Sequence, residues 1–125
     1  MFDYKLDLDH SVIVPIVGDA EIRGLQFEFP NLRVHIVQPV GGMEIDLLLT
    51  DMRFLYFHTD HPQNVIEKVF IYSSREDVRL PREVDPRVMD EELRSDGRYV
   101  IVIQSIVGGP LVCGARDFTM QVRTT

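Results

Sequence analysis

The chain has 125 residues, of which 45% are hydrophobic and 26% are charged, and its formal net charge at pH 7 is −7. This length is typical of one domain that buries roughly two-thirds of the surface of its unfolded chain, so we expect a single domain over residues 1–125. The composition excludes a disordered chain, and the acidic balance together with the lack of an apolar run of ~20 residues argues against nucleic-acid binding and a membrane span.

The N-terminal segment has the pattern of a half-buried strand. Apolar and polar residues alternate from residue 4 to residue 14, and Pro15 ends or bends the strand. The first ten residues carry acids where a signal peptide needs basic residues followed by an apolar run. We therefore expect a cytoplasmic location.

The next strand contains a change of phase. Ile22 occupies an even position, whereas Leu25 and Phe27 occupy odd positions, and Gly24 lies at the change. One extra residue in a strand reverses the faces of the side chains that follow, so the pattern predicts a β-bulge at this glycine. Residues 30–31, Pro-Asn, predict the turn that follows.

Short alternating segments continue along the chain. Residues 32–36, 43–49 and 52–58 alternate with a period of two, whereas residues 65–72 and 98–107 are apolar at successive positions. The last two segments should be central strands that are covered on both faces. We therefore predict a mainly β fold, an antiparallel sandwich or open barrel of about eight short strands.

One short helix is predicted near residues 86–95. Asp85 suits the N-cap position, Pro86 suits the first helical position, and Gly97 ends the segment. The surrounding region, residues 75–98, holds eight acids beside six arginines. Such a mixture favours a solvated segment with internal salt bridges over a nucleic-acid-binding patch.

The sequence contains no local catalytic motif. The single cysteine, Cys113, lies in an apolar segment and is expected to be a small buried side chain. The glycine pairs at 41–42 and 108–109 lack the Lys-Ser/Thr that follows a phosphate loop, and no Gly-x-Ser-x-Gly elbow is present. We therefore predict no catalytic residue, no metal and no cofactor.

The segment His58-Thr59-Asp60-His61 leaves an alternative open. A tight turn could bring His58, Asp60 and His61 together, and a small-ligand or metal-binding β-barrel could use them at its mouth. Pro62 excludes a helix at His61, and the residues here suit a simple turn. A zinc site would also need further ligands from elsewhere in the chain.

Acidic residues are concentrated early in the chain, where residues 1–51 hold nine acids and three bases. Complementary charge speeds the encounter of two proteins and restricts wrong partners, so an acidic face suits a basic protein partner. We predict a non-enzymatic protein-interaction module; a homodimer through the aromatic segment 54–57 is a further alternative. The partner-binding residues that we predict are the outward acids of the early strands: Asp7, Asp9, Glu21, Glu28, Glu44 and Asp46.

Three short stretches carry a resemblance to known proteins. They are Gly18-Asp19-Ala20-Glu21-Ile22 followed by Leu25, Phe27 and Phe29; Asn64-Val65-Ile66; and Ser105-Ile106-Val107-Gly108-Gly109. Over roughly residues 18–122 the chain resembles a group of small bacterial β-rich domains, some of which are immunity proteins for polymorphic toxins. Gly18 stands where that group often has a histidine. The resemblance implies an inhibitor that acts by binding a basic, nuclease-type toxin.

Overall fold

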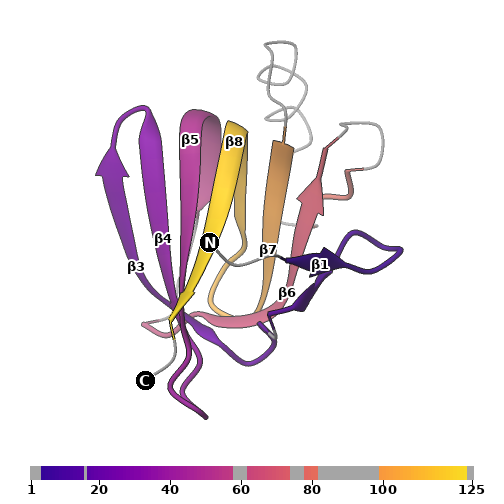
Figure 1. The fold of residues 1–125 in the computed structure, drawn as a ribbon, viewed down its shortest axis with the longest axis vertical. Helices are drawn as coiled ribbons and strands as arrows, with labels where there is room; N and C mark the ends of the chain where they lie inside the picture. Colours follow the sequence, from indigo (N-terminus) through magenta and orange to yellow (C-terminus); the bar gives the residue numbers. More distant parts are fainter. Residues whose placement is uncertain (1–3, 16, 58–61, 74–77, 82–98, 124–125) are drawn as a thin grey trace.

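The structure is a computed structural model that describes residues 4–15, 17–57, 62–73, 78–81 and 99–123 (Figure 1). It confirms the predicted mainly β fold with about eight antiparallel strands. The helix predicted near residues 86–95 lies outside the described residues. The strands are β1 (Lys5–Leu6), β2 (Val12–Val14), β3 (Glu21–Glu28), β4 (Asn31–Val37), β5 (Glu44–Phe57), β6 (Val65–Tyr72), β7 (Tyr99–Val107) and β8 (Leu111–Arg123).

Strands β3 to β8 form a closed antiparallel barrel in the order β3-β4-β5-β8-β7-β6. The closure between β3 and β6 is short, because Glu21 and Val65 are the one residue pair in register between these strands. A hydrogen bond from the backbone N–H of Ile22 to the Asn64 carbonyl, at 3.1 Å, extends the closure by one step. Figure 1 shows β3 and β6 diverging from this seam toward opposite sides of the barrel.

The two longest strands, β5 and β8, connect the two sides of the barrel. Their pairing shifts in register between Met52 and Phe54, next to Asp51, whose φ is +52°. The first half of β5 pairs with β4, whereas the first half of β8 pairs with β7. A bulge increases the bend and twist of a strand, so this one allows the same two strands to serve both sides of the barrel.

The predicted bulge in β3 is confirmed by a register shift between Ile22 and Gly24. After the shift, Leu25 and Phe27 lie opposite Val34 and Leu32, which are buried in the barrel interior. The extra residue therefore turns the odd positions of β3 toward the core, as the change of phase in the sequence indicates.

The barrel has apolar packing on its inside and on part of its outside. The interior is filled by large aliphatic side chains from all six strands, and an outer cluster of Phe54, Tyr72, Val100, Val102 and Val112 contacts Val78 and Leu80. Four successive residues of β7, 100–103, are buried, which confirms cover on both faces for this half of the strand, whereas Ile106 in the second half is 58% exposed. The same prediction is only partly correct for β6, where Glu67 and Lys68 are exposed.

The N-terminal segment is not the single strand that its alternation predicts. It forms the hairpin β1–β2, because side chains in residues 7–11 bond to the backbone and turn the chain. Asp7 Oδ1 accepts a hydrogen bond from the Leu8 N–H at 2.8 Å, and Asp9 Oδ1 accepts one from the Ser11 N–H at 3.0 Å. Aspartate side chains that bond locally in this way compete with strand pairing. His10 completes the turn with a φ of +68°.

Candidate protein-interaction surface

Strand β3 has one edge that no other strand covers in the described part of the chain. Past the pairing at Glu21, β3 pairs with β4 alone, and residues 23–28 have their second edge without a paired strand. Alternate backbone N–H and C=O groups of a strand point toward each of its edges. The edge formed by residues 23–28, which we call the β3 edge, therefore presents hydrogen-bonding groups to the outside of the barrel.

Two large aromatic side chains lie exposed at this edge. Phe27 is 53% exposed although it is on the inward face of β3, and Phe29, at the β3–β4 turn, is 85% exposed. Leu25 is partly buried against the interior on the same face as Phe27. The divergence of β3 from β6 (Figure 1) explains the exposure, because none of the described strands pairs with β3 at Phe27 on that side.

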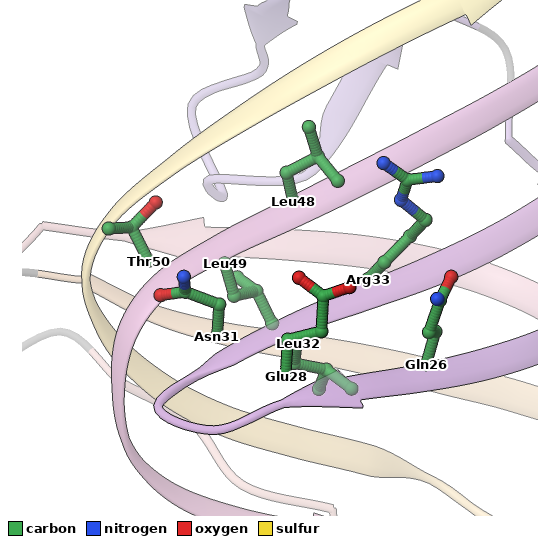
Figure 2. Close-up of a pocket in the computed structure, with 8 residues that line it drawn as sticks. All are labelled: Gln26, Glu28, Asn31, Leu32, Arg33, Leu48, Leu49 and Thr50. Carbon is green, nitrogen blue, oxygen red and sulfur yellow. The ribbon is translucent and has the colours of Figure 1, made fainter.

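The other face of the β3 edge borders a shallow pocket of about 330 Å³. Figure 2 shows side chains from β3, β4 and β5 around it, with Glu28 and Arg33 both at the pocket. Neither of these two side chains forms an ion pair or a hydrogen bond with another described residue. The pocket therefore offers one anionic and one cationic group to a partner. It is lined by Gln26, Glu28, Asn31, Leu32, Arg33, Leu48, Leu49 and Thr50.

Two of the predicted acids, Glu44 and Asp46, lie together around a histidine. His35 Nδ1 is 2.9 Å from Asp46 Oδ1, and His35 Nε2 is 3.3 Å from Glu44 Oε1. The Arg123 guanidinium donates to Asp46 Oδ2 at 3.0 Å. These carboxylates, on the outer face of β5, are therefore engaged by cationic or hydrogen-bonding groups of the same chain.

Glu21 is also engaged within the chain. It lies at the seam between β3 and β6, is buried, and accepts hydrogen bonds from Gln63 and Arg23. The hydrogen bond from Gln63 and then that from Arg23 lower the pKa of this carboxyl below its ordinary value. Its position and partners suit a role in closing the barrel.

Asp7 and Asp9 lie in the turn of the β1–β2 hairpin, where both are exposed. Hydrogen bonds from Ser11 lower the pKa of Asp9, and Lys68 Nζ lies 3.6 Å from Asp9 Oδ2. Glu28, at the end of β3, is the sixth predicted acid. The structure thus places the six acids in separate locations: the hairpin turn, the barrel seam, the end of β3 and the outer face of β5.

The remaining candidates from the sequence are the histidine segment and the single cysteine. His58, Asp60 and His61 lie outside the described residues, and the rest contain no cluster of three or more histidine, cysteine or acidic side chains that could hold a metal ion. Cys113 is fully buried, which raises the pKa of its thiol to about 12. Among the described residues there is no helix long and apolar enough to cross a membrane.

Sequence reasoning did not identify the β3 edge. It placed Leu25 and Phe27 on one face of the strand, which is correct, but alternation gives no information on which strands lie beside β3. The one available signal was the presence of two phenylalanines, Phe27 and Phe29, in the last residues before Pro30. Aromatic residues next to a turn are candidates for exposure.

No protein-family model matches this chain, and no curated protein or solved structure matches it. The geometry and charge of the molecule are therefore the grounds for assigning a function.

Proposed function

We propose that this protein is a non-enzymatic protein-interaction module that holds an extended segment of a partner protein along the β3 edge. The observation that carries the proposal is an unpaired strand edge flanked by two exposed phenylalanines, Phe27 and Phe29. Soluble proteins usually protect such edges with lysine, proline, short length or a covering element. Strand addition to a free edge is a common mode of peptide recognition.

The two faces of the β3 edge define the chemistry of the partner segment. Its backbone would form hydrogen bonds with β3, and its side chains would alternate between the two faces of the extended sheet. On one face they would meet Leu25 and Phe27, and on the other they would lie over the pocket with Glu28 and Arg33. The partner segment should therefore alternate apolar and charged residues.

The net charge of −7 supports a basic partner, because opposite charge accelerates the approach of two proteins. Asp7, Asp9 and Glu28 are the predicted acids with exposed carboxylates. A basic toxin bound by an immunity protein in the cytoplasm is the specific form of this proposal. It predicts that association slows as ionic strength rises, and that Asp7→Lys with Asp9→Lys lowers the association rate constant; an unchanged rate would count against steering by the hairpin acids.

The direct test uses extended peptides selected on the whole protein. A random 12-residue peptide library is selected on the immobilised protein, and the binders are titrated against isotopically labelled protein by NMR. We expect the amides of residues 23–28 to shift on binding. We expect Phe27→Lys to weaken binding by at least about tenfold, because a charge replaces an apolar contact at the edge.

Val40→Lys is the matched control. Val40 is 86% exposed and lies between β4 and β5, so this variant adds the same charge at another exposed apolar position. It should bind as the parent protein does. The proposal is wrong if selected peptides shift other residues and leave β3 unchanged, or if both lysine variants bind equally well.

A further inference from the structure

Figure 1 shows the β1–β2 hairpin beside β6, on the opposite side of the barrel from β3. A second hollow is found here, lined by residues of the β1–β2 turn, of β6 and β7, and by Arg79. Its volume is about 640 Å³, within the range of small-molecule sites. We call it the hairpin cleft. It is lined by Leu8, Asp9, His10, Phe70, Tyr72, Arg79 and Gln104.

The cleft has an aromatic floor. Phe70 and Tyr72 project from the same face of β6, and their rings stack with centroids 6.1 Å apart and planes at 10°. The His10 ring packs on Tyr72 with centroids 5.1 Å apart. Tyr72 is buried and Phe70 is only partly buried, so the accessible aromatic surface is that of Phe70. Leu8, at the rim, is 99% exposed.

Among the described residues, Arg79 is the charged side chain of the cleft that has no partner. The carboxylate of Asp9 is occupied by Ser11, whose N–H and hydroxyl both donate to Oδ1, and by the nearby Lys68. The guanidinium of Arg79 and the amide of Gln104 form no ion pair or hydrogen bond with another described residue. Within the part of the chain that the structure describes, these two sets of N–H donors have no acceptor, and they lie beside an aromatic surface.

We propose that the hairpin cleft binds a small aromatic anion, that is, a planar ring that carries a carboxylate or a phosphate group. The ring stacks on Phe70 and contacts Leu8, and the oxyanion accepts hydrogen bonds from Arg79 and Gln104. A guanidinium matches the geometry of both oxyanions through paired N–H donors, and offset stacking of rings adds to the burial of apolar area. This site is separate from the β3 edge, for which we propose a basic protein partner.

The test is a titration of the labelled full-length protein, observed by NMR, with benzoate and with phenyl phosphate. At least one of them should produce saturable shifts in Phe70, Tyr72 and Gln104, and which of them binds more tightly identifies the anionic group. Inorganic phosphate, which lacks the ring, and benzyl alcohol, which lacks the charge, should each bind more weakly.

Two pairs of variants separate the parts of the site. Arg79→Gln should weaken binding by about tenfold, because it removes a charge-assisted hydrogen bond, whereas Arg116→Gln should leave it unchanged. Arg116 is an exposed arginine that lies near Asp51 instead of the cleft. Phe70→Leu keeps the apolar volume but removes the ring, and should also weaken binding.

Several results would overturn the proposal. The first is that neither aromatic anion produces saturable shifts up to about 10 mM, which corresponds to negligible affinity. The second is that Arg79→Gln and the parent protein bind with equal affinity. The third is that inorganic phosphate or benzyl alcohol binds as tightly as the aromatic anions. A one-dimensional spectrum of each variant shows that it is folded, so a loss of binding can be assigned to the site.

Discussion

The β7–β8 turn fits closely against the start of β6, and this fit constrains individual residues. Asn64 is buried; its Nδ2 donates to the Gly109 carbonyl at 2.8 Å, and its Oδ1 accepts from the Ser105 hydroxyl at 2.8 Å. The Asn64 carbonyl in turn accepts from Ile22 at the barrel seam. Buried polar groups that are fully bonded fix a local geometry, so this turn stabilises the seam beside the β3 edge.

Gly108 is the residue at which this fit can be tested. Its φ is +93°, and a Cβ there would lie 2.9 Å from Asn64 Nδ2 and 3.1 Å from Asn64 Cα. We expect Gly108→Ala to lower the free energy of unfolding by about 2–3 kcal/mol, from backbone strain plus overpacking. Gly41→Ala should cost only about 1 kcal/mol, because its φ of +96° is similar but no atom lies within 4 Å. Urea denaturation measures both, and equal losses would show that the close approach to Asn64 has no energetic effect.

We expect the Glu21 carboxyl to make part of the free energy of unfolding depend on pH. Hydrogen bonds from Gln63 and Arg23 lower its folded-state pKa below the ordinary value of 4.5, so the ionised carboxyl stabilises the folded protein. A carboxyl whose pKa is lowered on folding stabilises the folded protein at pH values above its unfolded-state pKa. This stabilisation is lost as the pH falls through the folded-state pKa. The parent protein should therefore be more stable than Glu21→Gln at pH 7, and the difference should shrink below about pH 4.5.

Denaturation midpoints at several pH values test this prediction. Glu28→Gln is the control, since Glu28 is exposed and forms no ion pair with a described residue; this variant should be about as stable as the parent protein at pH 7. A difference between the parent and Glu21→Gln that stays constant down to about pH 3 would contradict the assignment of a stabilising carboxylate.

Single residues also show where local patterns mislead. The alternation of residues 4–14 is real, yet Asp7 and Asp9 bond to the backbone and convert the middle of the segment into a turn. The same residue type can serve as the polar face of a strand or as a turn former. Hydrophobic period alone does not choose between these two structures, so the hairpin could not be predicted from it.

Among the strands, β7 is the best predicted from sequence. Its run of four apolar residues, 100–103, indicates cover on both faces, and Val102 belongs to the outer cluster while Ile103 belongs to the interior. The bulge at Gly24 was also predictable, because a phase slip is a local signal. The divergence of β3 from β6 was not, since the pairing of Glu21 with Val65, far apart in the sequence, leaves no mark on the alternation of either strand.

Valine-to-alanine substitutions at two positions test whether the outer face of β7 is packed. Val102→Ala should lower the free energy of unfolding by about 2 kcal/mol, because it leaves a cavity in a packed cluster. Val40→Ala should change it by at most about 0.5 kcal/mol, because Val40 is 86% exposed. If Val102→Ala is as mild as Val40→Ala in urea denaturation, the outer face of β7 is not packed as described.

At the scale of the whole molecule, the barrel divides its surface into areas with different properties. Part of the outer face is apolar and contacts Val78 and Leu80, whereas the outer face of β4 and β5 carries His35 together with the carboxylates of Glu44 and Asp46. The β3 edge lies where the barrel is least closed. The net charge could be read directly from the sequence, but the separate locations of the acids could not, because they depend on the order and register of the strands.

Amide hydrogen exchange of the free protein, measured residue by residue by NMR, reports whether β3 presents a free edge. Amides that donate to β4 should exchange slowly, and those that point away from β4 should exchange fast, which gives an alternating pattern over residues 23–28. Slow exchange at every one of these residues would contradict a free β3 edge, because it would show that another part of the molecule already covers the edge.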